Sequence, residues 1–547
     1  MVFLSTLLIS LFVTMALIPM LRTAALRLHA GLDMPDARKV HTEPKPKVGG
    51  LAMAVGALAP VIFLADGGRL VDSILLGAGI IVVTGLVDDL RNMGWKAKFA
   101  GQTAAALVVI LYGGCHIHSL GSCLPDGVDL PEAVAFALTL LAIVGVTNAI
   151  NLSDGLDGLA GGSSLLIFLC IGYLAYVSTE APGLMLIATA MTGAIFGFLR
   201  FNTYPATVFM GDTGSQLLGF LAVTLSIAVT QQNPTLSTVL PLVIVGFPVL
   251  DTLTVMAERI AARRSPFVAD KNHFHHKLMR LGLWHTEAVV AIYAITALLV
   301  AAAYFLRFHS EWLLLSLYAI FAALVIGFFH EVERRGFRFH RTGLFDTALK
   351  QRLQVLKEKN LVIRASFPPV EYGIPLLFAA GALLPQEVPG YAGACAAGAA
   401  AALAVCWRLR REWVPGLLRL VFYFGVPFVM RLGEAEPAAW AQPAVRRGFM
   451  ACFVLLVFFV VMTVKFTRRQ KGFKPTPMDF LILLVALVVP NIPDPQLASL
   501  RMGELAAKII TMFFGFEVLL GELRGQYGRL VVGILVGLGV VAVRAVV

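Results

Sequence analysis

The feature that most constrains this chain is a succession of apolar segments long enough to cross a membrane. A helix needs about 20 apolar residues to span about 30 Å of hydrocarbon. Charged residues make up only 14% of the 547 residues, whereas soluble proteins contain about 25%. We therefore predict an all-α polytopic membrane protein. Its first module contains eleven apolar runs, at residues 3–21, 48–65, 70–87, 99–114, 132–150, 160–178, 184–199, 215–231, 236–256, 287–306 and 312–330.

Basic residues between these runs predict the orientation of the helices. If the N-terminus faces outward, the inward loops carry fifteen Lys and Arg residues, whereas the outward loops carry only Arg69 and Arg307. Cytoplasmic loops of membrane proteins have this excess of positive charge. The net charge of +11 is thus spread over loops, and we expect no nucleic-acid partner. On the outward side, Cys115 and Cys123 are either disulfide-bonded or unlinked.

The composition divides the chain into three parts. Residues 1–330 form the first membrane module. Residues 331–368 are basic and amphipathic, with too many charges to insert into a bilayer, and we expect a cytoplasmic connector. Residues 369–547 contain six or seven further apolar runs that Pro and Arg interrupt. They predict a C-terminal helical membrane module.

Acidic residues are concentrated at the predicted inward ends of the helices. A carboxylate in or beside hydrocarbon is costly unless it is paired, hydrated or bound to a cation. Asp88 and Asp89 end the third run, and Mg²⁺ or a basic group would neutralise such an adjacent pair. Lys96 and Lys98 follow them, and a lysine ammonium suits a phosphate. The alternatives are a hydrated helix end and ordinary topological charge.

The segment NAINLSDGLDGLAGG holds a second polar cluster. Asn148, Asn151, Asp154 and Asp157 are spaced three residues apart, so on a continuous helix they would lie along one ridge. Four polar groups on one ridge at a membrane boundary indicate a polar ligand. The glycines among them permit close backbone approach or tight helix packing.

Two later segments add anion-binding chemistry. Asp212 precedes the eighth run, where free backbone N–H groups favour phosphate and the acid can hold a bridging metal ion. An N-cap role is the alternative. Residues 263–277 combine basic side chains with His273, His275 and His276. They favour a cradle for a diphosphate over a zinc site, because nearby Arg and Lys would repel the metal ion. A basic loop that contacts anionic lipid is the alternative.

The inward face thus combines carboxylates, amides, basic groups and histidines, which is the inventory of a metal-assisted phosphoryl transfer. No P-loop motif occurs in the sequence. A lipid or ion transporter that uses the same acids is the competing interpretation. Transporters bind near the bilayer midplane, whereas these acids lie at helix ends, and we find no internal repeat. We therefore favour an enzyme.

The motifs resemble those of the polyprenyl-phosphate N-acetylhexosamine-1-phosphate transferases. This family contains phospho-N-acetylmuramoyl-pentapeptide transferase and undecaprenyl-phosphate N-acetylglucosaminyl-1-phosphate transferase, and the second is the more similar type. The resemblance covers residues 1 to about 330. It depends on five segments that occur in the same order, PDARKVHTEPKPKVGG at 35–50, VDD at 87–89, NAINLSDGLDGLAGG at 148–162, VFMGDTGS at 208–215 and SPFVADKNHFHHKLMRLG at 265–282.

The resemblance implies transfer of a sugar 1-phosphate from a UDP-sugar to undecaprenyl phosphate, with release of UMP. It implies Mg²⁺, or Mn²⁺ in its place, at a cleft on the cytoplasmic face of a bacterial inner membrane. We expect a homodimer whose product starts a lipid-linked cell-envelope glycan. The histidine loop favours UDP-N-acetylglucosamine as the donor, while UDP-N-acetylmuramoyl-pentapeptide and a modified UDP-N-acetylhexosamine stay open.

The resemblance also implies roles for single residues. Asp88, Asp89 and Asp157 match catalytic acids, and one of the first two is a candidate base toward the lipid phosphate. Asp212 and Asp89 match metal ligands. The other matches are nucleotide-binding Asn151, Asp154 and Asp157, and phosphate- or sugar-binding Lys96, His273, His275 and His276. Direct attack by the lipid phosphate and a covalent aspartyl intermediate both stay open.

The C-terminal module departs from the family pattern, because relatives of this kind usually end soon after the first module. Residues 369–547 carry none of the family motifs. We consider three roles for them, which are dimerisation, docking of the next glycosyltransferase, and lipid handling.

Overall fold

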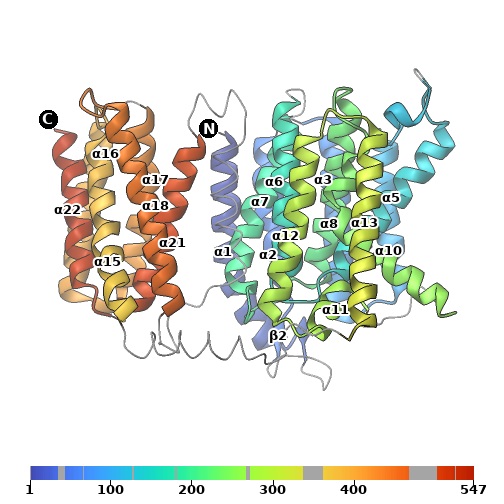
Figure 1. The fold of residues 1–547 in the computed structure, drawn as a ribbon, viewed down its shortest axis with the longest axis horizontal. Coiled ribbons are helices and arrows are strands. Elements are labelled where there is room, and N and C mark those ends of the chain that lie inside the picture. Colours follow the sequence, from blue (N-terminus) through green and yellow to red (C-terminus); the bar gives the residue numbers. More distant parts are fainter. Residues whose placement is uncertain are drawn as a thin grey trace. The chain divides into compact units, whose positions relative to one another are not determined.

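A computed structural model of the chain describes residues 2–34, 44–65, 67–125, 128–178, 182–265, 272–336, 361–435, 437–466, 502–523 and 525–546. The chain divides into two compact units, Met1–Arg341 and Thr342–Val547. Most of the predicted connector lies outside the described residues. The described elements are almost all helices, and eleven of them are long and apolar enough to cross a membrane (Figure 1). The predicted all-α polytopic membrane fold is confirmed.

The first unit has helical structure at each of the eleven predicted apolar runs. The ninth run is divided into two helices at Val245. A short antiparallel pair of strands, β1 (Leu32–Asp33) and β2 (Lys45–Pro46), follows the first helix. The helices are α1 (Val2–Leu28), α2 (Gly49–Leu64), α3 (Arg69–Arg91), α4 (Trp95–Leu107), α5 (Glu132–Leu152), α6 (Leu159–Val177), α7 (Pro182–Asn202), α8 (Gly211–Gln232), α9 (Leu240–Ile244), α10 (Gly246–Ala261), α11 (Phe274–Arg280), α12 (His285–Phe305) and α13 (Glu311–Arg334).

Helix α8 is the centre of the first unit. All residues in the most apolar stretch of α8 are buried within the protein, whereas only 11% of those in the corresponding stretch of α13 are buried. Helices α2, α3, α5, α6 and α7 pack around α8. Its buried Thr224, Ser226 and Thr230 hydroxyls donate to carbonyls of the preceding helical turn, so these polar groups are satisfied within the helix.

Glycines allow the neighbours of α8 to approach its backbone closely. A Cβ atom on Gly85 of α3 would lie 2.6 Å from the Cα atom of Thr213, and one on Gly50 of α2 would lie 2.2 Å from the amide nitrogen of Gly214. Small residues have this role at membrane helix interfaces. The close approach at Gly85 brings the acidic end of α3, one turn later, against the first turn of α8.

The second unit has its own apolar core. The aromatic rings of Phe422 and Phe516 stack with centroids 4.1 Å apart, and Phe378 packs against Phe422. Of the predicted C-terminal runs, the one near residues 479–492 lies outside the described residues. The described helices are α15 (Leu361–Leu383), α16 (Gly390–Leu409), α17 (Val414–Ala435), α18 (Pro443–Phe466), α21 (Met502–Leu523) and α22 (Gly528–Arg544).

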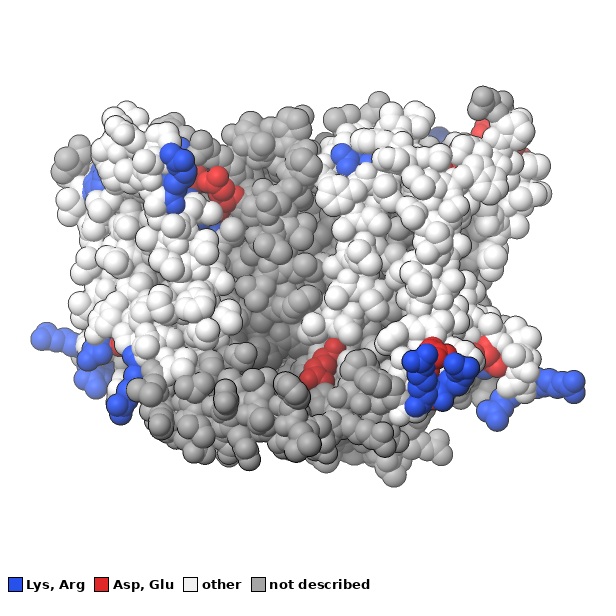
Figure 2. Space-filling model, viewed as in Figure 1, with Lys and Arg blue, Asp and Glu red and all other residues white. Residues whose placement is uncertain are grey.

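Charged side chains gather near the ends of the helices, with an uncharged band between them, as Figure 2 shows on its visible face. This distribution is the one expected where the band faces hydrocarbon. Cys115 and Cys123 are both free thiols, so the unlinked alternative describes them.

Candidate active site

The acidic end of α3 caps the start of α8. The carboxylate of Asp89 accepts hydrogen bonds from the amides of Asp212 and Thr213, both at 2.9 Å, and from the Thr213 hydroxyl at 2.7 Å. The first amides of a helix have no partner within the helix, and a carboxylate satisfies them well. The cap of α8 is therefore Asp89 from another helix, and not Asp212 itself.

This arrangement leaves Asp88 and Asp212 beside each other with a shared basic partner. The ammonium of Lys98 contacts Asp88 Oδ2 at 2.5 Å and Asp212 Oδ1 at 3.2 Å. The other oxygen of Asp88 accepts a hydrogen bond from the Met93 amide at 2.6 Å. Asp88 and Asp89 are both buried, so the neighbouring helices fix the direction in which their oxygens point.

Of the two lysines that follow the acidic pair, Lys98 is the one that contacts the acids. Lys96 is exposed, and its ammonium lies 5.7 Å from the centroid of the Trp95 ring. The two lysines are two residues apart on α4, so they lie on nearly opposite faces of the helix. Lys98 shares its face with the buried Gln102, four residues later, and this spacing is the signal that identifies it.

Amide side chains at the end of α5 continue the network. Asn151 donates to Asp212 Oδ1 at 3.0 Å and accepts from the Ser215 hydroxyl at 2.9 Å. Asn148 donates to Gln102 at 2.6 Å. These contacts join α4, α5 and α8 next to the acidic cluster. Gln102 lies outside the quoted motifs, and Ser215 lies in VFMGDTGS but was given no role from the sequence.

Asp154 and Asp157 do not continue the helical ridge of Asn148 and Asn151, which corrects the prediction from spacing. Helix α5 ends at Leu152, and the chain turns through residues 153–158 to Gly158, whose φ is +80°. That backbone conformation favours glycine, and it lies directly before the first residue of α6, Leu159. Within the turn, Asp157 Oδ2 accepts a hydrogen bond from the Ala206 amide at 2.9 Å, which ties the loop to the segment that follows α7.

Asp154 is partly buried in this loop and close to other carboxylates. Burial, together with the charges of Asp212, Asp157 and Asp89, raises the pKa of Asp154 to about 7. A carboxyl group that holds its proton near neutral pH is typical of a functional cluster of acids. The loop therefore concentrates negative charge beside α8, where a cation would stabilise it.

The histidines of the last motif, residues 265–282, lie on or beside α11. His273 Nδ1 contacts Asp251 Oδ2 at 2.9 Å. His275 is buried and packs on Gly155 of the 153–158 loop, where an added Cβ would lie 2.1 Å from His275 Nε2. Burial and the neighbouring histidines lower the pKa of His275 to about 3, so the ring is neutral at neutral pH. His276 is partly exposed and its ring lies 4.2 Å from that of His275.

Two further groups at this site were not expected from the sequence. Asp251 is a buried acid on α10, and only the spatial proximity of α10 and α11 identifies it. His285, the first residue of α12, accepts a hydrogen bond from the Asp157 amide at 3.1 Å, and its ring stacks on Tyr204. Residues 266–271, in the middle of the same motif, lie outside the described part of the chain.

The oxygen ligands that these aspartates offer suit Mg²⁺, which water and substrate phosphates also coordinate, better than they suit a metal ion held by protein side chains alone. Mg²⁺ prefers oxygen ligands and usually binds one or two carboxylates, with waters and substrate phosphates completing its shell. Asp88 Oδ2 and Asp212 Oδ1 both contact one ammonium group, so one cation can neutralise both. Asp89 already accepts three hydrogen bonds. Within the described residues, no three His, Cys, Asp or Glu side chains are arranged to hold a metal ion alone.

Comparison with known proteins identifies relatives of one kind. The profile of glycosyl transferase family 4 matches residues 71–230. A probable undecaprenyl-phosphate N-acetylglucosaminyl 1-phosphate transferase of Bacillus subtilis is 36% identical over 321 residues, which are 58% of this chain and 88% of the relative. A decaprenyl-phosphate N-acetylglucosaminephosphotransferase of Mycolicibacterium smegmatis is 33% identical over 50% of this chain and 74% of its own. An undecaprenyl-phosphate alpha-N-acetylglucosaminyl 1-phosphate transferase of Escherichia coli O157:H7 is 31% identical over 54% of this chain and 83% of the relative.

Proposed function

This chain belongs to glycosyl transferase family 4 and is a phospho-N-acetylhexosamine transferase, and from this premise we propose that it transfers N-acetylglucosamine 1-phosphate from UDP-N-acetylglucosamine to undecaprenyl phosphate. UMP is the second product, and Mg²⁺ is the cofactor. The names of the relatives support a polyprenyl-phosphate acceptor and N-acetylglucosamine as the sugar.

One observation carries the proposal. Aspartates from three separate segments, the end of α3, the 153–158 loop and the start of α8, converge around the start of the central helix. Lys98 is the basic side chain that contacts two of them. A transferase whose two substrates are both anionic needs such a site, because acids that hold a cation allow the phosphates to approach each other.

In the proposed reaction, Asp88 is the base toward the lipid phosphate. Its Oδ1 is held by the Met93 amide, so Oδ2 is the atom available for a proton. Lys98 contacts this oxygen and stabilises negative charge that develops on the phosphates. Asn151 orients Asp212 through a 3.0 Å hydrogen bond.

Asp212 would hold Mg²⁺, and Asp89 keeps Asp212 in place by accepting a hydrogen bond from its backbone amide. The metal ion would supply charge neutralisation of the phosphates and of the leaving UMP. We assign Asp154 and Asp157, in their glycine-containing loop, to the nucleotide. His273 and His276 are assigned to the diphosphate or sugar.

We place the reaction at the cytoplasmic face of a bacterial inner membrane. The N-terminus would face outward, and the product would start a lipid-linked cell-envelope glycan. The concentration of Lys and Arg in the loops next to Asp88 and Asp212 supports this orientation.

The test is a panel of nucleotide sugars supplied to purified protein with undecaprenyl phosphate and Mg²⁺. We expect UMP release with UDP-N-acetylglucosamine, slower or no release with UDP-N-acetylmuramoyl-pentapeptide, and none with EDTA. If no UDP-N-acetylhexosamine yields UMP, the proposed reaction is wrong. Preference for another UDP-N-acetylhexosamine would change the sugar and keep the reaction class.

A further inference from the structure

Asp251 makes two contacts with the residues at the start of α11. It lies on α10 and is only 2% exposed. Its Oδ1 accepts a hydrogen bond from the Phe274 amide at 2.7 Å, and its Oδ2 lies 2.9 Å from His273 Nδ1. One buried carboxylate therefore caps a helix and holds the ring of the histidine that precedes it.

The chemistry of a carboxylate determines which nitrogen of His273 carries a hydrogen. An ionised carboxylate only accepts hydrogen bonds, so His273 Nδ1 must be the donor. Nε2 is then the nitrogen left for a substrate. Histidines in functional sites are commonly oriented in this way, through a hydrogen bond from the nitrogen that does not contact the ligand.

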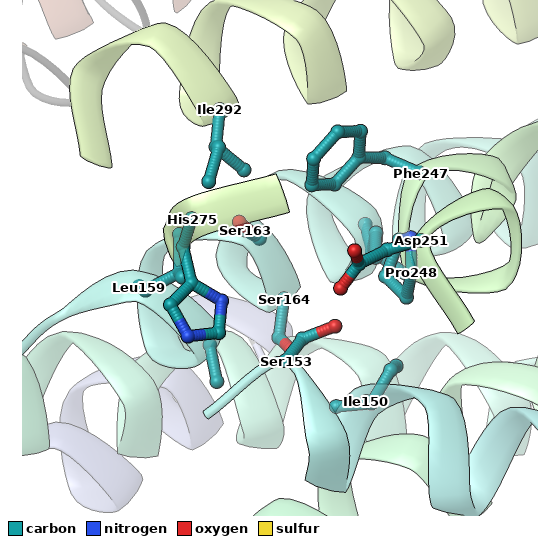
Figure 3. A pocket seen from close by; sticks show the side chains of 12 residues that line it. Ile150, Ser153, Leu159, Ser163, Ser164, Phe247, Pro248, Asp251, His275 and Ile292 are labelled. Carbon is teal, nitrogen blue, oxygen red and sulfur yellow. The ribbon is translucent and has the colours of Figure 1, made fainter. Parts of the chain in front are cut away.

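The same short helix also touches the loop assigned to the nucleotide. His275, two residues after His273, packs on Gly155. Asp251, His275 and Ser153 line one small cavity between α10, α11 and the end of α5 (Figure 3). A change in the start of α11 would therefore be transmitted to the 153–158 loop as well as to His273.

We propose that Asp251 is a positioning residue for the transfer reaction, which holds His273 so that Nε2 is presented to the UDP-sugar. The inference depends on the proposed function, since it assigns a role within that reaction. Asp251 has no direct contact with substrate in this account and acts through His273.

The chain offers a matched control on the same pair of helices. Glu258 of α10 forms an ion pair with Lys277 of α11, and Lys277 is buried. Glu258→Gln and Asp251→Asn each weaken one contact between α10 and α11. Only the second changes a contact to His273. In Asp251→Asn the side-chain oxygen can still accept from the Phe274 amide, while the side-chain NH₂ group opposes the Nδ1 hydrogen of His273.

The experiment measures UMP release by the full-length protein as a function of UDP-N-acetylglucosamine concentration. We expect Asp251→Asn to lower kcat/KM for the UDP-sugar by about 10- to 100-fold, as for other carboxylates that orient a functional histidine. The KM for undecaprenyl phosphate and the thermal transition should match those of Glu258→Gln. In a His273→Ala background, Asp251→Asn should cause no further loss, because both changes remove the same interaction.

Two results would overturn the inference. One is an Asp251→Asn protein as active as Glu258→Gln, and the other is a full additional loss in the His273→Ala background. If Asp251→Asn does not fold, Asp251→Glu replaces it with Glu258→Asp as its control, and equal activities would have the same meaning. Absence of UMP release by the unmodified protein contradicts the proposed function instead, so the two failures are distinguishable.

Discussion

The two units differ in how their acidic side chains are arranged. In the first unit, aspartates from α3, α8 and the 153–158 loop converge, and Lys98 contacts only two of them. In the second unit, three glutamates each have a basic partner on another helix. These pairs are Glu371 with Arg529, Glu434 with Lys508 and Arg446, and Glu517 with Arg419.

The difference indicates a ligand-binding site in the first unit and structural contacts between helices in the second. Like charges that are brought together cost stability, and the fold retains them where a ligand or cation is to bind. Pairs of opposite charge between helices neutralise each other and fix the packing of their helices. Among the described residues of the second unit, these pairs join α15 to α22, α17 to α18 and α21, and so support a stabilising role for the charges that form them.

The largest effect is expected at the start of α8. Asp212→Asn should lower the rate of UMP release at least about 100-fold, since an electrostatic contact of this kind contributes roughly 3 to 4 kcal/mol to the transition state. The asparagine retains the shape and the contact with Asn151, so the thermal transition should change little. Asp72→Asn, at the other end of α3, is the control and should remain active. Full activity of Asp212→Asn would remove Asp212 from the site.

A substitution in an ion pair of the second unit should lower the stability of the protein and leave the rate of UMP release unchanged. Glu434→Gln leaves the ammonium of Lys508, which is 3% exposed, without its carboxylate. Loss of one partner from a buried ion pair costs about 3 kcal/mol. We expect a lower thermal transition for the second unit and an unchanged rate of UMP release below that temperature. Glu331→Gln, in an exposed pair, is the control. A large loss of rate at unchanged stability would contradict this division of roles.

The sequence predicted the elements of the fold well, because apolar run length is a local property. It also located Asp88, Asp89 and Asp212 at helix ends. It misjudged Asp154 and Asp157, since a spacing of three residues indicates a helical ridge only if the helix continues, and α5 ends at Leu152, before either residue. The loop that follows is held by a contact with the segment after α7, which is not visible in the local pattern.

Contacts between distant segments account for the other differences. Lys96 and Lys98 are equivalent as loop charges, and only the packed face of α4 distinguishes them. Asp251 lies in an apolar run 22 residues before His273, so no motif joins the two. Asp89 matched a metal ligand by resemblance, and its role as the cap of α8 follows from the close approach of α3 at Gly85.

Removal of the second unit tests whether the division holds for the whole chain. The catalytic acids and their contacts all lie within Met1–Arg341. Deletion of residues 345–547 should therefore lower UMP release by less than about tenfold, which is about 1.4 kcal/mol. The measurement needs a thermal transition to show that the shortened protein is folded. Complete loss of activity in a folded protein would mean that the second unit contributes to the reaction.

The smallest effect is expected at Asp154. Replacing its carboxyl group should raise the stability of the protein at pH 8, whereas replacing that of Glu434 should lower it. Burial and nearby carboxylates raise the pKa of Asp154 to about 7, so the folded protein holds its proton more tightly than the unfolded chain. The stability that this proton contributes is fully present below about pH 4 and is lost as the pH rises through about 7. Between pH 6 and pH 8, in EDTA, the free energy of unfolding should fall by about 1 kcal/mol from this group.

Asp154→Asn should remove that part of the pH dependence, because asparagine does not titrate. Thermal transitions of the two proteins at pH 6 and pH 8 check this, with Glu331→Gln expected to keep the slope of the unmodified protein. The variant should be the more stable one at pH 8 and should still release UMP less efficiently, since the nucleotide would lose an ionised acceptor. Equal slopes would mean that Asp154 ionises as an ordinary aspartate, and the charge of the cluster would then be neutralised by Lys98 more completely than its two contacts indicate.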